Sequence, residues 1–217
     1  MPMNSTSRSL ARKRSSLIDA VFAGALVLGA IGSLSGCVAV VAGSAVGGGL
    51  MLADRRTGGA QIEDQSIELK SGSRVHDAIG DRGHVNVTSY NRVVLVTGEV
   101  PTDADKDSVG KAIAGIENVS NVVNELAVMG SSSLASRSSD TVLTGRVKTA
   151  LIDAKDLQAT AIKVVTERGI VYLMGRVTTQ EADRAANIVR DVGGVLKVVR
   201  VFETITDEQL KALNGGK

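Results

Sequence analysis

The sequence predicts an α+β protein made of two copies of one helix-strand-strand-helix-strand unit. Residues 87–100, VTSYNRVVLVTGEV, align without a gap with residues 164–177, VVTERGIVYLMGRV. After one deleted residue the match resumes between residues 116–126 and 192–202. Runs rich in Val, Ile and Tyr, each interrupted by two turn-forming residues, are typical of β-hairpins. An internal repeat of this kind indicates one structural unit used twice.

Each unit is expected to place its elements in the same order. The hairpin strands are expected at 85–90 and 93–100 in the first unit and at 162–167 and 170–177 in the second. Helices are predicted to start at Thr102 and Thr178, because a threonine followed three residues later by an acid caps a helix. Last strands follow at 119–128 and 195–204. Right-handed crossovers would place them parallel to the second hairpin strands, giving a three-stranded mixed sheet covered by two helices.

A first helix is predicted before each hairpin. In the second unit, apolar residues recur at helical spacing and form one apolar face, at Leu143, Val147, Ala150, Leu151 and Ala154. Gly98 and Gly175 each stand alone inside the pattern of a predicted strand. They predict a structural turn, a bulge or a close approach of two backbones rather than a phosphate-binding loop.

The N-terminal segment has the features of a secretory leader. Four basic residues, Arg8, Arg12, Lys13 and Arg14, precede an apolar run at 20–31 that is too short to span a bilayer. Leu34-Ser35-Gly36-Cys37 follows, with the only cysteine of the chain, and resembles a bacterial lipobox. Cys37 is therefore predicted to be the lipidated N-terminus of the mature protein. Two or more acyl chains would give stable anchoring, which one chain alone does not.

The domain organisation follows from these segments. We expect a signal peptide at 1–36, a lipidated tether at 37–60, a first domain at 61–129, a Ser/Gly linker at 130–139, a second domain at 140–205 and a C-terminal tail at 206–217. The tether is glycine-rich and apolar up to Leu52. It is either a plain spacer or a second element that contacts lipid or a partner, with Arg55 and Arg56 at the headgroups.

Charge separates the two units. Without the leader, the chain has 21 basic and 22 acidic residues, so its basic pI belongs to the leader and does not indicate nucleic-acid binding. Residues 62–129 carry a net charge of −5, whereas residues 140–204 carry +2. Only the second unit suits an anionic surface.

The unit resembles the BON domain, with the glycines of VTGEV and LMGRV at the usual glycine position of that domain. With its lipobox, tether and two units, the chain resembles the dual BON-domain outer-membrane lipoprotein family (DolP-like) of Gram-negative bacteria. The resemblance implies a lipid-anchored protein of the outer membrane that faces the periplasm, supports outer-membrane integrity and binds anionic phospholipid through its second BON domain. Val38, rather than aspartate, after the cysteine agrees with outer-membrane sorting in such lipoproteins. The chain has no tryptophan, so an aromatic membrane anchor is absent.

The expected lipid site lies on the first helix of the second unit and beside it. Its predicted residues are Val142, Leu143, Arg146, Lys148 and Lys155, and its expected ligand is a phosphatidylglycerol-like anionic membrane. The alternative is an interaction scaffold, whose acidic first unit contacts outer-membrane assembly machinery or a peptidoglycan partner. A solvated helical face would explain the same charges equally well from the sequence alone, and the family resemblance favours lipid binding.

No enzymatic activity is expected. His76 and His84 lie in the first unit without a cysteine partner or a recurring carboxylate frame, so neither a catalytic triad nor a metal site is indicated. Asp103, Asp105 and Asp107 lack the remaining ligands of a calcium loop and are expected in a first helical turn. We therefore expect no cofactor.

Overall fold

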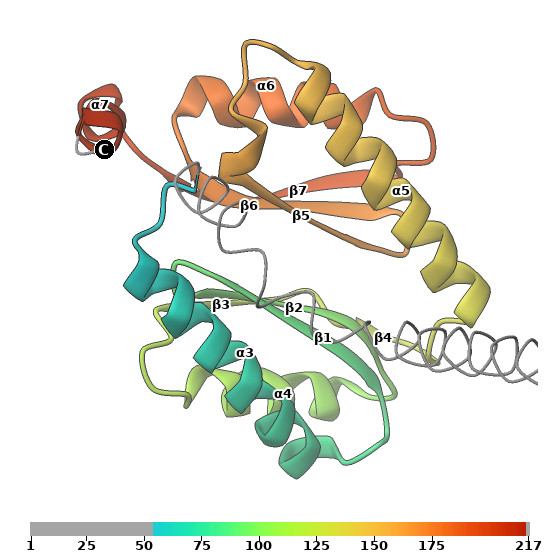
Figure 1. Ribbon diagram of the computed structural model, residues 1–217. Helices are drawn as coiled ribbons and strands as arrows, with labels where there is room; N and C mark the ends of the chain where they lie inside the picture. Colours follow the sequence, from blue (N-terminus) through green and yellow to red (C-terminus); the bar gives the residue numbers. More distant parts are fainter. Residues whose placement is uncertain (1–53, 216–217) are drawn as a thin grey trace, which may run out of the picture. The chain divides into compact units, whose positions relative to one another are not determined.

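A computed structural model describes residues 54–215 of the chain. The expected signal peptide, Cys37 and the expected tether up to residue 53 lie outside the described residues. Residues Leu50–Lys217 form one compact unit that contains both repeats. The first repeat is coloured cyan to green in Figure 1, and the second is yellow to red.

The first repeat forms a mixed sheet with two helices on one side of it (Figure 1). Helix α3 (Gly58–Ile79) precedes the hairpin of β1 (His84–Tyr90) and β2 (Val93–Val100), and α4 (Asp103–Ala114) follows it. The last strand is divided into β3 (Asn121–Asn124) and β4 (Ala127–Val128). Strand β2 is central, antiparallel to β1 and parallel to both β3 and β4. The parallel pairing predicted from the crossover rule is confirmed.

The second repeat has the same topology. Helix α5 (Leu134–Asp153) leads through a short 3-10 turn, η1 (Ala159–Ala161), to β5 (Ile162–Glu167) and β6 (Ile170–Val177). Helix α6 (Thr179–Arg190) then returns the chain to β7 (Lys197–Thr204), which pairs in parallel with β6 over its whole length. The predicted threonine caps are present: Thr102 accepts from the amide of Asp105, and Thr178 forms a complete capping box with Glu181. The α+β fold and the order of elements are confirmed.

Each repeat has its own core between the helices and one face of the sheet. Val94, Val96 and Val100 of β2 point into the first core, and Val171, Leu173 and Val177 of β6 point into the second. The side chains that alternate with them lie on the opposite face. There Tyr90 and Leu95 of the first repeat form a third buried cluster with Tyr172 and Met174 of the second. The two sheets therefore bury both faces, because the repeats pack on each other.

Three segments differ from the sequence prediction. Helix α5 begins at Leu134, inside the segment expected to be a flexible linker, because Ser133 accepts from the amide of Ser136 and caps the helix there. The expected tail contains a further helix, α7 (Asp207–Gly215). Helix α3 begins at Gly58, capped by Thr57, so the expected tether ends earlier than residue 60.

Gly98 and Gly175 lie inside β2 and β6 rather than in turns. A Cβ atom at Gly98 would overlap the carbonyl oxygen of His84, and one at Gly175 would overlap the carbonyl oxygen of Ala161. Among the alternatives drawn from the sequence, the close approach of two backbones is the correct one. Glycine is needed in the same place of both repeats because the neighbouring chain leaves no room for a side chain.

Candidate functional site

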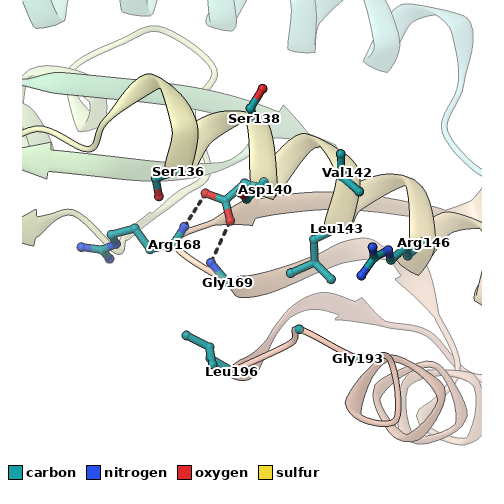
Figure 2. Close-up of a pocket in the computed structure, with 12 residues that line it drawn as sticks. Ser136, Ser138, Asp140, Val142, Leu143, Arg146, Arg168, Gly169, Gly193 and Leu196 are labelled. Carbon is teal, nitrogen blue, oxygen red and sulfur yellow. Dashed lines mark hydrogen bonds between the residues drawn. The ribbon is translucent and has the colours of Figure 1, made fainter.

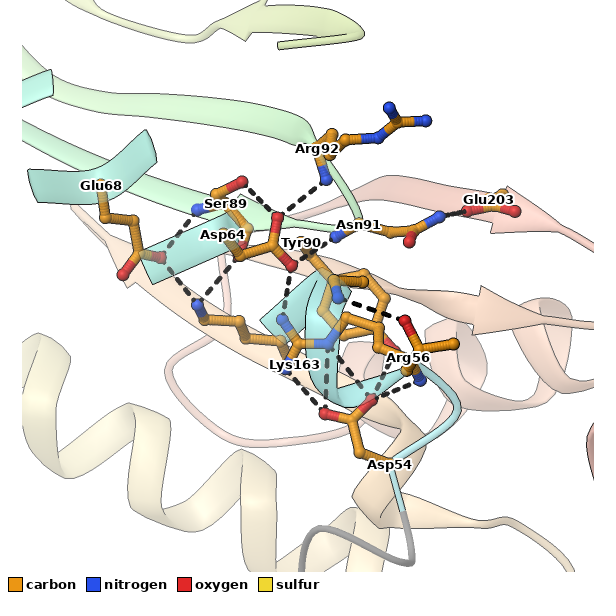
Figure 3. Close-up of polar contacts among 12 residues, drawn as sticks. Asp54, Arg56, Asp64, Glu68, Ser89, Tyr90, Asn91, Arg92, Lys163 and Glu203 are labelled. Carbon is orange, nitrogen blue, oxygen red and sulfur yellow. Dashed lines mark hydrogen bonds and ion pairs between the residues drawn. The ribbon is translucent and has the colours of Figure 1, made fainter. Parts of the chain in front are cut away.

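An aspartate in the first helix of each repeat holds the turn of the following hairpin. In the second repeat, Asp140 of α5 accepts hydrogen bonds of 2.8 Å from the amides of Arg168 and Gly169 (Figure 2). In the first repeat, Asp64 of α3 accepts bonds of 2.8 Å from the amides of Asn91 and Arg92 (Figure 3). Both carboxylates are buried. We call this arrangement the aspartate clamp.

The clamp of the first repeat has additional partners. Asp64 also accepts from the hydroxyl of Ser89 at 2.6 Å and pairs with the guanidinium of Arg56 at 2.8 Å. Burial opposes ionisation of Asp64, but the bonds from Ser89, from the two amides and from Arg56 together lower the pKa of this carboxyl below its usual value. Arg56 lies over the ring of Tyr90, 4.2 Å from its centroid, so the cation is held by both acid and ring.

Beside its clamp, the second repeat has an open groove of about 700 Å³. The groove lies between the N-terminal half of α5 and the turn that connects α6 to β7 (Figure 2). Ser139, Asp140 and Arg146 line it from the helix, Arg168 and Gly169 from the hairpin turn, and Gly194 and Leu196 from the α6–β7 turn. Leu143 is also part of the lining but belongs to the buried core.

The equivalent groove of the first repeat is bridged by side chains. Asn118, in the α4–β3 turn, donates a hydrogen bond of 3.1 Å to Glu63 of α3. The equivalent positions in the second repeat are Gly194 and Ser139, which are too short to meet across the gap. Gly194 has φ +102, and Asn118 has φ +67, so both turns need a residue that tolerates the left-handed region. Because the second repeat has Gly194 where the first has Asn118, no side chain from this turn bridges its groove.

Two exposed apolar side chains, Val142 and Leu196, line the open groove, and a third, Leu134, is exposed at the start of the same helix α5. The exposed fractions are 81% for Leu134, 56% for Val142 and 79% for Leu196. When the two sequences are aligned on their helix caps and on their clamps, Gly58, Ser66 and Ser120 are the equivalent residues of the first repeat. Large apolar side chains that are exposed together mark a contact surface more often than isolated ones do. We call the groove with these three residues the groove surface.

The predicted site residues do not all lie in one place. Val142 and Arg146 lie on the exposed side of α5 at the groove, as expected, and Leu143 forms its floor. Lys148 instead lines a separate pocket of about 410 Å³ with Leu151 and Ile152. Lys155 lies beyond the end of α5, exposed in the loop that follows.

Two residues of the groove surface were not predicted from the sequence. Arg168 belongs to the hairpin turn, where it resembled an ordinary turn residue, and Leu196 followed a turn of glycines. A signal for the clamp was present, because DQSI at 64–67 and DTVL at 140–143 stand at equivalent places before the two hairpins.

Polar contacts link the two repeats around their shared apolar cluster. Lys163 pairs with Glu68 at 3.0 Å (Figure 3), and Asn91 donates to Glu203 at 2.6 Å. Burial between the sheets raises the pKa of Tyr90 and that of Tyr172 to about 12.

The interpretation of Arg55 and Arg56 as residues of the headgroup region is wrong. Arg55 is buried against the second repeat, with 3% of its side chain exposed, and Arg56 is held by Asp54 and Asp64. Both guanidinium groups therefore bind within the folded unit.

The remaining candidate residues have local partners. His76 lies 3.6 Å from Asp81, and His84 contacts Asn86 at 3.2 Å. Asp105 bonds to Thr102 in the helix cap and pairs with Arg82 at 2.9 Å. Within residues 54–215, no three His, Cys, Asp or Glu side chains are grouped as metal ligands. Nor does any helix in that part of the chain combine the length and apolar character needed to cross a membrane.

Comparison with known proteins agrees with the repeat structure. The BON domain family matches residues 63–130 and 139–205. The chain is 41% identical to the outer membrane lipoprotein DolP of Haemophilus influenzae, over 82% of this chain and 94% of that protein. It is 32% identical to a 21 kDa hemolysin of Actinobacillus pleuropneumoniae, over 70% of this chain and 79% of that one. It is 29% identical to the osmotically-inducible protein Y of Escherichia coli, over 66% and 73%.

Proposed function

Because this chain belongs to the BON-domain family and carries two BON domains, we propose that it is an outer-membrane lipoprotein that binds anionic phospholipid through its second domain. Its anchor is Cys37 and its folded part faces the periplasm. Binding of phospholipid by the second domain would support the integrity of the membrane that carries the protein.

Two observations support lipid attachment at Cys37, one from a relative and one from the sequence. The relative from Haemophilus influenzae is an outer membrane lipoprotein by name, and this chain covers 94% of it. The basic leader, the apolar run and the sequence Leu34-Ser35-Gly36-Cys37 are what lipid attachment at Cys37 requires. With Val38 in the next position, the outer membrane is the expected destination.

The observation that carries the lipid proposal is the groove surface, which the first repeat lacks. Val142 is exposed next to the groove, and Arg146 lies one turn further along the same helix. An apolar side chain beside a cation is suited to the boundary between acyl chains and phosphates. Arg168 also lines the groove, but its guanidinium is directed toward the first repeat, with Nη1 3.3 Å from the sulfur of Met129, so Arg146 is the cation available to a ligand. The ligand is thus an anionic headgroup with neighbouring acyl chains.

The expected binding is weak and electrostatic. Each basic residue near an anionic surface contributes on the order of 1 kcal/mol. The chain has no tryptophan, and the rim is aliphatic, so insertion should be shallow. Arg168 is also partly engaged by Glu99 of the first repeat, 3.9 Å away. Binding should therefore require anionic lipid and weaken as salt shortens the Debye length from about 10 Å at 0.1 M to about 3 Å at 1 M.

Vesicle co-sedimentation of fragment 50–217 tests the lipid site without the anchor. Val142→Asp and Arg146→Glu should each reduce binding to phosphatidylglycerol vesicles several-fold. Ser66→Asp and Lys70→Glu make similar charge changes at the equivalent positions of the first repeat and should have little effect. If the second-repeat variants bind like wild type, or if neutral vesicles bind equally well, α5 is not the lipid site.

Fractionation of the full chain tests the anchor separately. Cys37→Ala should abolish membrane attachment and leave an uncleaved or soluble product. A variant that is processed normally and remains in the outer membrane would contradict lipidation at Cys37.

A second candidate function is a protein-binding scaffold based on the first repeat. Helix α3 exposes 69% of Ile62 and 79% of Leu69, which lie two turns apart on one face. The equivalent positions in α5 are Ser138 and Gly145. This apolar face on an acidic repeat suits an outer-membrane assembly or peptidoglycan-associated partner. Leu69→Asp should then impair function in cells while leaving vesicle binding unchanged, and loss of vesicle binding would assign α3 to the membrane instead.

A further inference from the structure

Two adjacent arginines at the start of the folded part bind different repeats. Arg56 pairs with Asp54 and Asp64 and lies over Tyr90, all in its own repeat or next to it (Figure 3). Arg55 binds the second repeat, more than a hundred residues further along the chain. The peptide between them is thus held at the boundary of the two repeats.

The guanidinium of Arg55 is bound by three groups of the second repeat. It makes two bonds to the carboxylate of Glu181, of 2.7 and 2.6 Å, one from each terminal nitrogen. It also donates to the carbonyl oxygen of Arg176 at 2.8 Å and to the side-chain oxygen of Gln158 at 3.1 Å. Only 3% of the Arg55 side chain and 17% of the Glu181 side chain are exposed.

These acceptors are fixed by the second repeat itself. Glu181 is held in the first turn of α6, where its carboxylate accepts from the amide of Thr178 and completes the capping box. Arg176 is in β6, and Gln158 precedes the short turn η1. A planar guanidinium can satisfy a carboxylate with two parallel bonds, and a lysine ammonium cannot do so. The bond from Arg55 also lowers the pKa of Glu181, although burial opposes this.

We propose that the second repeat contains a guanidinium-binding socket, formed by Gln158, Arg176 and Glu181, that captures Arg55 and fixes the membrane-proximal end of the folded chain to the second repeat. This capture is independent of lipid binding. The pair of Glu68 and Lys163 between the repeats is more exposed, with side-chain exposures of 33% and 36%, and the buried pair of Arg168 and Glu99 is longer, at 3.9 Å. Arg55 is therefore the buried connection that joins the end of the tether to the second repeat.

The consequence concerns the position of the second repeat relative to the anchor. Sixteen residues lie between Cys37 and Asp54, and a fully extended chain over these 17 steps reaches at most about 60 Å. With Arg55 in its socket, this length begins beside the second repeat. If the proposed lipid function holds, the socket keeps the groove surface within reach of the anchoring membrane.

Limited trypsin digestion of the full chain in detergent tests the socket. Trypsin cleaves after arginine and lysine, and Arg55 should resist cleavage while it is buried. Glu181→Gln keeps a residue that can complete the capping box but removes the carboxylate. It should increase the rate of cleavage after position 55 by at least about tenfold, corresponding to about 1.4 kcal/mol. Asp156→Asn, which breaks the exposed pair with Arg184, is the matched control and should leave the rate unchanged.

A second variant changes Arg55 itself and leaves the residues of the second repeat as they are. Arg55→Lys preserves the trypsin site but cannot make the two parallel bonds, and it should also increase cleavage after position 55. If both variants are cut there as slowly as wild type, the socket does not hold Arg55 and the proposal fails. Equal acceleration by Asp156→Asn would show general loosening and would also overturn it. None of these rates depends on lipid, so they decide the socket separately from the lipid function.

Discussion

The two repeats keep the same clamp but differ in the groove next to it. Asp64 and Asp140 occupy equivalent positions and bind equivalent backbone amides. In the first repeat, Asn118 and Glu63 bridge the groove, whereas Gly194 and Ser139 leave it open in the second. The clamp shapes the hairpin turn that the fold requires. The groove is not needed for folding, so it can differ between the copies.

The difference in charge points the same way. The repeat with the open groove carries +2 and exposes leucine and valine around it, whereas the repeat with the bridged groove carries −5 and has serine or glycine at those positions. In net charge and in exposed apolar side chains, the second repeat suits an anionic surface and the first does not.

The largest effect is expected at the shared glycines. Gly98→Val and Gly175→Val should each destabilise their own repeat by about 3 kcal/mol, because the new side chain overlaps the carbonyl oxygen of His84 or Ala161. Thr178→Ala removes a helix cap and should cost only about 1 kcal/mol. Urea unfolding of fragment 50–217 measures these losses, and hydrogen exchange assigns them to a repeat. Equal losses for Gly175→Val and Thr178→Ala would contradict the close backbone approach.

A smaller difference is expected between the two clamps. Asp64→Ala removes one of the two carboxylates that bind the Arg56 cation and also the acceptor of the Ser89 hydroxyl and of two amides, and it should cost about 3 kcal/mol. In the second repeat, Asp140→Ala removes the acceptor of two backbone amides, those of Arg168 and Gly169, and should cost about 2 kcal/mol. The comparison uses urea midpoints of the two variants. A larger loss for Asp140→Ala would show that the partners of Asp64 add nothing.

The smallest effect is a pH dependence of the first clamp. The folded pKa of Asp64 is lowered relative to the unfolded value, which is about 3.9. Its contribution is therefore fully present above about pH 4 and is lost as the pH falls through the folded pKa. Asp64→Asn should be less stable at neutral pH but should lose less stability between about pH 4 and pH 2 than wild type. If urea titrations show that Asp64→Asn loses as much stability as wild type over this pH range, Asp64 is not the source of the pH dependence.

Most of the fold could be predicted from the sequence because local signals and the repeat agree. The alternating apolar strands, the threonine caps and the glycine in each second strand appear twice, so each copy supports the interpretation of the other. Helix α5 was predicted too short at its start. The serines before it resemble a linker in composition, and only the bond between Ser133 and the amide of Ser136 shows that they begin a helix.

The site was harder to predict because its residues meet only through tertiary packing. Val142 and Arg146 share a helix and could be paired by spacing, but Arg168 and Leu196 reach the groove from two separate turns. The packing of the repeats was also not predicted. Strands β2 and β6 are apolar on both faces, which is the pattern of a sheet covered on both sides, but the covering element cannot be identified from periodicity.

Closing the groove of the second repeat tests the central claim most directly. The double variant Ser139→Gln, Gly194→Asn would imitate the bridge of Asn118 and Glu63 without changing the net charge. Fragment 50–217 with this change should bind phosphatidylglycerol vesicles several-fold more weakly than wild type, while Ser139→Gln alone should bind as wild type does. A circular dichroism melt establishes that the double variant is folded. Undiminished binding by the folded double variant would contradict the claim that the open groove distinguishes the second repeat.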